Sequence, residues 1–289
     1  MSDLIGLLRS AIAERVEPGA TGITLSGGLD SSTIAALSDP ALPTLSAYYP
    51  VPGFDERAYS RMAAHADHTE VRIEARDLAR ALDSIGPFLR RPWQGPGTLG
   101  QYVFAMRIRE ARPEVRVLLS GEGSDELFGG YARTLLAAGE PLPEGYEGYA
   151  PPADYPAGDL HAALAYDLAR LPDLPAVDDQ VAAPWGLEAR ASFTDPAIVA
   201  YALALPDRER VGKRHLRAAV RGIVPDAIID RRDKMGMPVP IVRWAQEEPL
   251  RSAIGDRLGY LPDPERPGDR GWWYGLLDAL TGEPGEAAA

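Results

Sequence analysis

One short segment of the sequence has the residue types needed to bind a phosphate anion. The stretch SGGLDSS, residues 26–32, follows a short apolar run and opens a run with helical spacing. Adjacent glycines allow a tight turn with accessible backbone N–H groups, and a helix N-terminus adds unpaired donors and a favourable dipole. No Gly-Lys-Ser/Thr sequence follows, so this is not a Walker loop. The simpler alternative is an ordinary strand-to-helix turn, against which the three serine hydroxyls count.

Asp30 places a carboxylate inside this predicted phosphate site. Two negative charges that face each other need a cation between them, so Asp30 indicates a bound metal ion. A second acidic group, with Glu122, Asp125 and Glu126, lies in LSGEGSDELFGGY at residues 119–131. Because ligands of open α/β sheets bind at the carboxyl edge, where both segments begin, we expect Asp125 to meet Asp30 as a second metal ligand. The alternative, that the acidic residues only favour a helix N-terminus, does not account for the surrounding glycines.

Lysine is rare in this chain. Of 30 Lys and Arg residues only Lys213 and Lys234 are lysines. Codon bias explains the scarcity but not the two exceptions. A slender, mobile ammonium can follow a phosphate that moves during a reaction, where a planar guanidinium fits poorly. We therefore expect a functional role for at least one of the two.

The elements that must position these residues alternate between strand and helix. The strands are predicted at 22–25, 44–49, 69–73 and 115–119, and the helices of this half at 30–37, 55–66, from 76 and from 99. This order predicts an α/β fold with a doubly wound parallel sheet. Further helices are predicted at the N-terminus and at 161–171, 196–205 and 213–220.

Two segments lack any hydrophobic period. Residues 139–158 are rich in Pro, Gly and Tyr and predict a long irregular loop, which is either a connector or an active-site lid. Residues 263–289 are predicted to be a Pro/Gly-rich tail whose last residues, GEPGEAAA, are disordered.

Composition excludes several classes of function. The chain has 289 residues, 45% of them apolar, which suits one large domain or two small ones. It contains no cysteine, which excludes disulfides, thiolate metal sites and cysteine nucleophiles. The absence of a long apolar run and of a signal peptide predicts a cytoplasmic protein. A net charge of −12 argues against nucleic acid and anionic membranes as partners.

Taken together, SGGLDSS and LSGEGSDELFGGY resemble the synthetase domain of asparagine synthetases, a branch of the PP-loop ATP pyrophosphatases. Shorter matches follow in the family's order at DERAY (55–59), HTEV (68–71), EARASFTD (188–195), GKRHLR (212–217) and RRDKMG (231–236). The resemblance covers about residues 22–240. It implies an adenine nucleotide alpha hydrolase-like sheet with a helical C-terminal part. The domain would span 1–262, with a nucleotide core at about 18–135, a lid at about 139–158 and a helical part at about 159–250.

The resemblance also implies cofactors and residue roles. The cofactors would be ATP and Mg²⁺. The nucleotide-binding residues would be Leu25, Ser26, Gly27, Gly28, Asp30, Ser31, Ser32, Ser120, Gly121, Lys213 and Lys234. Asp30 and Asp125 would bind the metal, and Glu122 and Lys234 would be catalytic. The reaction would activate a small-molecule or peptide carboxylate as an acyl-adenylate, release pyrophosphate, and end with attack by ammonia or an amine.

The sequence departs from the family pattern in ways that leave the identity of the attacking amine undetermined. Full-length synthetases begin with a cysteine that hydrolyses glutamine, and this chain has no cysteine. Ammonia would come from solution, from a separate glutaminase or from a substrate-delivery protein; alternatively the nucleophile is another amine, as in lasso-peptide cyclases and β-lactam synthetases. Since β-lactam synthetases carry tyrosine at the position of Glu122, the sequence argues against a β-lactam former.

Two rival interpretations come from other classes. A tRNA-modifying PP-loop enzyme would need nucleic-acid contacts, which the net charge of −12 and the two lysines disfavour. A degenerate partner subunit of an amidotransferase complex would have lost its acidic ligands, whereas Asp30, Glu122, Asp125 and Lys234 are all present.

Overall fold

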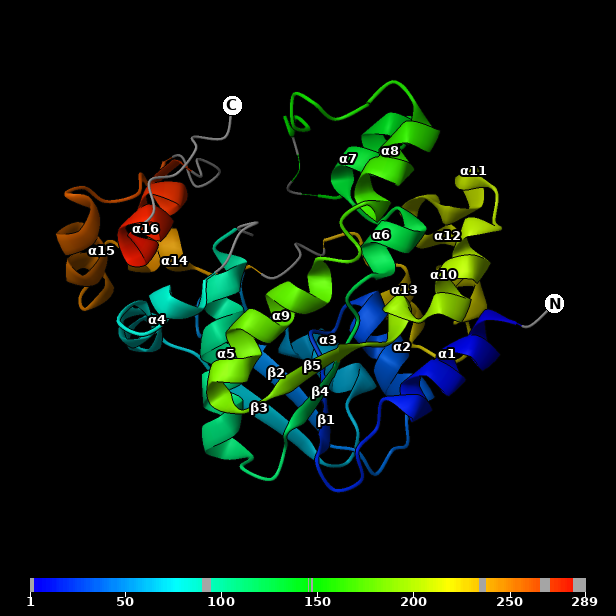
Figure 1. Ribbon diagram of the computed structural model, residues 1–289, viewed down its shortest axis with the longest axis horizontal. Helices are drawn as coiled ribbons and strands as arrows, with labels where there is room; N and C mark the ends of the chain where they lie inside the picture. The colour runs from blue at the N-terminus through cyan, green and yellow to red at the C-terminus, as the bar shows by residue number, and fades with distance from the viewer. Residues whose placement is uncertain are drawn as a thin grey trace.

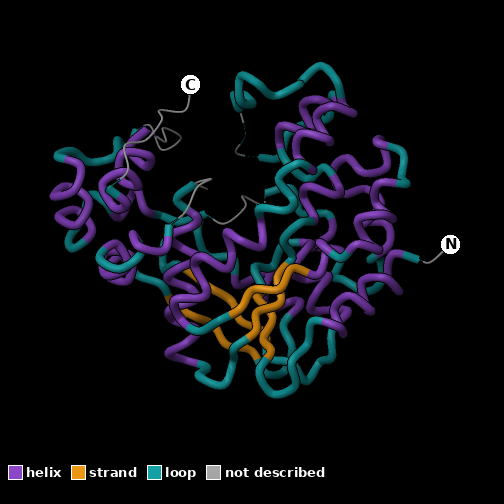
Figure 2. Tube along the Cα trace, viewed as in Figure 1, coloured by secondary structure: helices purple, strands orange, loops and turns teal. Residues whose placement is uncertain are grey.

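The computed structural model describes residues 3–89, 95–144, 146, 148–233, 238–265 and 271–282. Within these residues, five parallel strands form one sheet in the order β3-β2-β1-β4-β5, with helices on both faces (Figures 1 and 2). The strands are β1 Thr21–Thr24, β2 Thr44–Tyr48, β3 His68–Arg72, β4 Val117–Ser120 and β5 Glu188–Ala191. The predicted α/β fold with a doubly wound parallel sheet is therefore confirmed.

The predicted helices occur in the predicted order, with boundaries that differ by a few residues, whereas α6, α7, α9, α11, α13, α14, α15 and α16 were not predicted. They are α1 Leu4–Glu14, α2 Leu29–Leu37, α3 Arg57–Ala63, α4 Ala75–Leu82, α5 Gly97–Ala111, α6 Ser124–Phe128, α7 Ala132–Ala138, α8 Leu160–Leu168, α9 Leu174–Ala182, α10 Pro196–Leu203, α11 Asp207–Arg210, α12 Arg214–Ala219, α13 Asp226–Ile229, α14 Ile241–Trp244, α15 Leu250–Leu258 and α16 Gly271–Thr281. Short 3₁₀ turns occur at Gly86–Phe88, Ala183–Trp185, Ser192–Thr194 and Val211–Lys213.

Each face of the sheet has its own apolar core. Successive strand side chains point to opposite faces, so Leu118 of β4 joins one core while Val117 and Leu119 join the other. The first core contains residues of α4, α5, α9, α14, α15 and α16, and the second contains residues of α1, α2, α6, α10, α12 and α13. The sheet is thus the middle of three layers (Figure 1).

The strand order reverses its direction between β1 and β4. From β1 the chain proceeds to β2 and β3 on one side of the sheet, and β4 and β5 are added on the other side. Ile23 of β1 pairs with Thr44 of β2 on one side and with Leu119 of β4 on the other. In open α/β sheets, ligands bind beyond the carboxyl ends of the strands at such a reversal. The loops after β1 and β4 both leave the sheet there, and they are the two predicted motifs.

The prediction for the C-terminal tail was wrong in part, because residues 263–289 include helix α16. Its side chains Trp272, Trp273, Leu276 and Leu277 are buried in the first core. Their spacing of one, four and five residues forms an apolar stripe that the sequence already contained. Residues 283–289, which hold most of the predicted disordered end, lie outside the described residues.

The described residues of 139–158 form neither helix nor strand, which confirms the irregular loop. Its Tyr155 is buried against α7 and α8, so part of the loop belongs to the packed structure. Among the described residues, no helix combines the length and the apolar character that a membrane span requires.

Candidate active site

The loop after β1 is folded by its own serines. The Ser31 hydroxyl accepts a hydrogen bond from the Ser26 backbone N–H at 3.2 Å, and the Ser26 hydroxyl accepts one from the Gly28 N–H at 3.3 Å. Gly28 caps α2 without a side-chain hydrogen bond, so donors of the first helical turn face outwards from the helix end. The hydroxyl of Ser32 is buried and has no hydrogen-bond partner among the described residues. Its unpaired hydroxyl and the helix end suit a phosphate.

Glycine is required in this loop because of a close approach. Gly27 has a φ of 76°, and a Cβ there would lie 2.5 Å from the backbone nitrogen of Ser60. Leu25 anchors the loop to the sheet, since its backbone N–H donates to Leu45 at 2.8 Å. The loop is thus fixed by the sheet on one side and by α3 on the other.

The loop after β4 packs directly on the loop after β1. A Cβ at Gly121 would lie 2.7 Å from the Cβ of Asp30 and 2.9 Å from the backbone nitrogen of Ser31, so only glycine fits between the two motifs. Ser120, the last residue of β4, precedes it. Ser124, the first residue of α6, donates its hydroxyl to Asp30 Oδ1 at 2.7 Å. The two motifs predicted to meet are therefore in contact.

Lys213 joins the two predicted metal ligands. Its Nζ lies 2.6 Å from Asp30 Oδ2 and 2.7 Å from Asp125 Oδ1, and its side chain is 9% exposed. Burial lowers the pKa of Lys213, but the charges of Asp125 and Asp30 outweigh this and raise it, so the side chain is an ammonium. Burial raises the pKa of Asp125, and Lys213 opposes the shift. Gly130 makes this approach possible, because a Cβ there would lie 2.2 Å from Lys213 Cε.

The donor set at Asp30 and Asp125 fits Mg²⁺, which prefers carboxylate, phosphate and water oxygens. Among the described residues, no three acidic or histidine side chains converge as a metal-binding group. The two aspartates would therefore be the protein's ligands, and the remaining ligands would be phosphate oxygens and water.

A second acidic group lies beside the first. Glu126 is 1% exposed, and burial raises its pKa to about 7, while the hydroxyl of Tyr131, which donates to it, opposes the shift. Burial, together with the charge of Asp178, raises the pKa of half-buried Glu122 well above its ordinary value. Burial and the charge of Asp179 raise the pKa of Asp178 to about 7.

Asp178 was not predicted as a site residue. It lies on α9, and its Oδ1 accepts a hydrogen bond from Gln101 of α5 at 3.4 Å. Its charge contributes to the raised pKa of Glu122, so the two carboxyls lie within electrostatic range of each other. The sequence offered only the pair Asp178-Asp179 in a helical run, and nothing in its spacing indicates which carboxylate faces the site.

Two arginines add positive charge near the phosphate loop, although the chain as a whole is acidic. Burial lowers the pKa of Arg217 on α12, and the nearby Asp30 opposes the shift. Arg231 lies 3.8 Å from the centre of the Tyr59 ring and donates to Glu56 at 2.7 Å. Neither was predicted individually, although Arg231 belongs to the segment RRDKMG that also contains Lys234. Lys234 itself lies outside the described residues, and its catalytic role stays a prediction.

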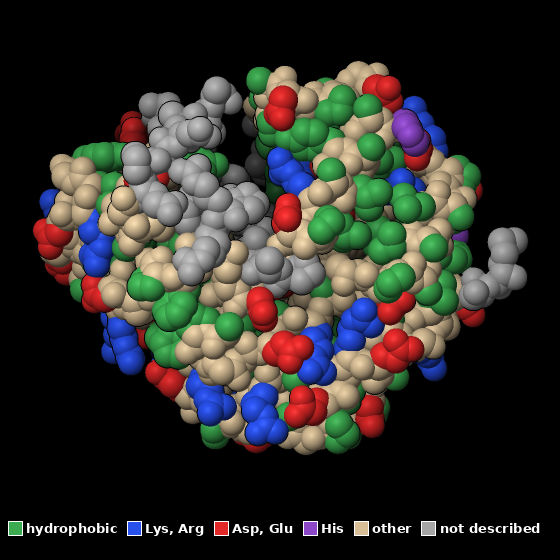
Figure 3. Space-filling model, viewed as in Figure 1, with side chains coloured by type: hydrophobic (Ala, Val, Ile, Leu, Met, Phe, Trp, Pro, Cys, Tyr) green, Lys and Arg blue, Asp and Glu red, His purple; other side chains and the backbone are tan. Residues whose placement is uncertain are grey.

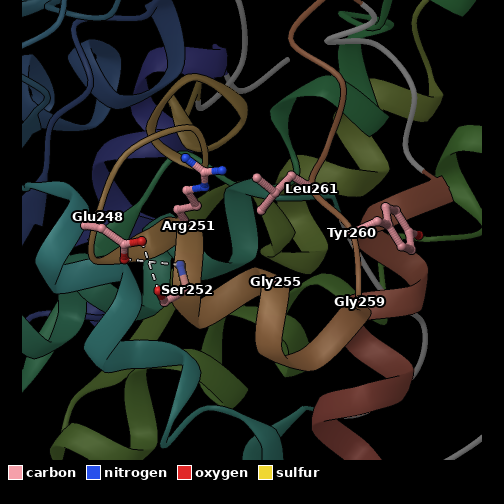
Figure 4. A pocket seen from close by; sticks show the side chains of 7 residues that line it. All are labelled: Glu248, Arg251, Ser252, Gly255, Gly259, Tyr260 and Leu261. Atoms are coloured by element: carbon pink, nitrogen blue, oxygen red, sulfur yellow. Dashed lines mark hydrogen bonds between the residues drawn. The ribbon is translucent and has the colours of Figure 1, made fainter.

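The surface also has hollows away from the sheet edge. One of about 260 Å³ lies on α15 and the turn after it, where Glu248 accepts hydrogen bonds from the backbone and hydroxyl of Ser252 (Figure 4). Its lining comes from one continuous segment. Acidic and basic side chains are interspersed on the face shown in Figure 3. The sheet edge differs, because it gathers charged side chains from the loop after β4, from α2, α6 and α9, and from α12 with the turn before it. We therefore assign the candidate site to the sheet edge.

A parallel sheet with a glycine- and serine-rich loop and paired aspartates at its point of reversal is typical of α/β enzymes that bind nucleotides. The asparagine synthase family profile matches residues 3–150 and 150–274. The chain therefore belongs to the asparagine synthase family, which confirms the resemblance stated from the motifs.

Curated relatives agree with this assignment. The chain is 28% identical to a putative glutamine-hydrolysing asparagine synthetase of Mycobacterium tuberculosis, over 84% of this chain and 48% of the relative. It is 26% identical to glutamine-hydrolysing asparagine synthetase 1 of Bacillus subtilis, over 78% of this chain and 47% of the relative. The identity to the Homo sapiens glutamine-hydrolysing asparagine synthetase is 31%, over 66% of this chain and 33% of the relative. The chain thus spans about half the length of the first two relatives.

Proposed function

We propose that this chain is an ATP-dependent amide-forming ligase that activates a substrate carboxylate as an acyl-adenylate. The observation that carries the proposal is the convergence of Asp30, Asp125 and Lys213 beside the N-terminus of α2. This arrangement supplies carboxylate ligands for a metal ion next to donors for phosphate oxygens. Family membership supports the same chemistry.

In the first step, a carboxylate oxygen of the substrate attacks the α-phosphorus of ATP, and the bond to pyrophosphate breaks. The loop 26–32 and Lys213 hold the pyrophosphate, and the unpaired Ser32 hydroxyl donates to it. Asp30 and Asp125 would hold Mg²⁺, which would neutralise phosphate charge when bound. The protein's contribution is mainly alignment and charge stabilisation.

In the second step, ammonia or a substrate amine attacks the acyl carbon, and AMP leaves. The incoming nitrogen must lose a proton. We assign Glu122 and Asp178 as the pair that accepts it, because burial and neighbouring charges raise the pKa of each carboxyl and the charge of Asp178 acts on Glu122. A pair of this kind holds one proton over a wide pH range and titrates jointly. Lys234 is retained as the cation predicted to stabilise the oxygen that gains charge.

Pyrophosphate exchange tests the proposal. Radiolabelled pyrophosphate should enter ATP only when the correct carboxylate is present, so a panel of amino acids, other small carboxylic acids and peptides identifies the acyl substrate. Asp125→Asn should abolish exchange, whereas the exposed Asp256→Asn should not change it. Chromatography should then find AMP, not ADP, after addition of an amine. ADP as the main nucleotide product would rule out the acyl-adenylate.

A further inference from the structure

Lys213 has an unusual backbone. Its φ of 57° and ψ of 28° lie in the left-handed region, and it is the non-glycine residue with positive φ within the described part of the chain. Residues with a Cβ avoid this region unless the surrounding structure holds them there. Gly212, with a φ of 63°, shares the turn.

Contacts with α6 hold this turn in place. The Gly212 N–H donates to the Gly129 carbonyl at 2.9 Å, and Arg210 donates to the Leu127 carbonyl at 2.8 Å. Val211 between them is fully buried. The backbone at Lys213 is therefore determined by packing, and the lysine side chain extends from this fixed point to the two aspartates.

The ammonium engages the carboxylate oxygens that a metal ion would need. It contacts Asp30 Oδ2 and Asp125 Oδ1, while Asp30 Oδ1 already accepts a hydrogen bond from the Ser124 hydroxyl. Both oxygens of Asp30 are thus bonded within the protein. A divalent cation that approached these oxygens would meet a positive charge in direct contact with them, and like charges at such distances repel strongly.

We propose that Lys213 is an internal counter-cation that holds Asp30 and Asp125 in the nucleotide-free protein and excludes a divalent cation from them until ATP arrives. The inference rests on the proposed function of this site. Lysine suits the role because its ammonium is a mobile point charge on a flexible stem with three donors. When phosphate oxygens enter, the ammonium moves to them and leaves the aspartates to the cation. The cation therefore binds with the nucleotide and not before it.

Mn²⁺ binding measured without turnover tests the proposal. Mn²⁺ uses the same oxygen ligands, and free Mn²⁺ is counted by electron paramagnetic resonance. In the wild type, Mn²⁺ should bind at least about 100-fold more tightly with α,β-methylene-ATP than alone, beyond its affinity for the nucleotide itself. In Lys213→Met without nucleotide, Mn²⁺ should bind at least about tenfold more tightly than in the wild type, a difference of about 1.4 kcal/mol.

Arg214→Met is the matched control. It removes a neighbouring positive charge, but the Arg214 side chain is exposed and pairs with Glu140, so nucleotide-free Mn²⁺ binding should stay within about twofold of wild type. If Lys213→Met is folded only with Mn²⁺, the proposal is supported, because the metal then replaces the lost cation. If it does not fold at all, two measurements still test the proposal. One is Mn²⁺ binding to Lys213→Gln, and the other is Mn²⁺ binding to the wild type with and without α,β-methylene-ATP.

Tight Mn²⁺ binding to the nucleotide-free wild type would overturn the counter-cation role and leave the ligase proposal intact. A folded Lys213→Met protein that binds Mn²⁺ no more tightly than the wild type in the absence of nucleotide would also overturn the counter-cation role. Absence of Mn²⁺ binding to the wild type even with nucleotide would overturn both the counter-cation role and the ligase proposal.

Discussion

Replacing Glu126 by glutamine should make the protein more stable at neutral and alkaline pH. Glu126 is 1% exposed, and burial raises its pKa from an ordinary value of 4.5 to about 7. The raised pKa means that the folded state binds a proton which the unfolded state has lost between these pH values. The stability that this proton supplies is complete below about pH 4.5 and is lost as the pH rises to about 7.

Each pKa unit corresponds to about 1.4 kcal/mol, so the wild type should lose up to about 3 kcal/mol from this group across the window. Glutamine does not titrate, and its carbonyl can still accept the Tyr131 hydroxyl. Glu126→Gln should therefore match the wild type near pH 4.5 and exceed it by about 3 kcal/mol at pH 8.

Urea unfolding of both proteins at intervals between pH 4.5 and 8 measures this difference. The exposed Glu144→Gln is the control, because it removes one carboxylate without removing a buried one, and it should follow the wild type at every pH. A Glu126→Gln protein that differs from wild type by a constant amount, or that is the less stable of the two at pH 8, would refute the reasoning.

Three further predictions test other contacts. Arg133→Met should destabilise the fold by about 3–5 kcal/mol in urea unfolding, because it leaves the fully buried Asp167 without its 2.6 Å ion pair. The double variant with Asp167→Asn should recover much of this loss. No recovery would mean that Arg133 acts through packing alone. Gly130→Ala should weaken ATP binding in calorimetry by at least about tenfold, because its Cβ would lie 1.9 Å from Asp125 Oδ1, whereas Gly158→Ala has open space and should bind normally. Asp178→Asn should lower turnover by about 10²–10⁴ and remove the rise in rate as the pH passes about 7, whereas the exposed Asp256→Asn, far from the site, should keep both; an unchanged pH profile for Asp178→Asn would exclude it as proton acceptor.

Local patterns in the sequence were sufficient to predict most of the fold. The apolar runs of β1, β2 and β4 are short and buried, which is typical of parallel strands between layers of helices. Strand β5 was missed because Glu188 and Arg190 occupy two of its four positions, as an edge strand permits. Helix α16 was missed because the Pro and Gly content around it outweighed the spacing of its tryptophans.

The candidate site was predictable only where a motif carried it. The contact between Asp30 and the loop after β4 follows from two strands that end at the same edge of the sheet. The ammonium of Lys213 between the aspartates was not predicted, because it depends on a left-handed turn and on its packing against α6. The position of Asp178 depends on how α9 packs against α5, which no local pattern encodes.

The contact between Lys213 and Asp30 also has a consequence for folding. The two residues are 183 positions apart in the sequence, so their ion pair closes one of the longest loops of the chain. Contacts of such large sequence separation tend to form late, after local structure and the sheet are in place. A growing chain on the ribosome that has not yet reached residue 213 lacks the lysine altogether. Nucleotide binding should therefore report completion of the fold, and it can serve as a probe for the last step of refolding.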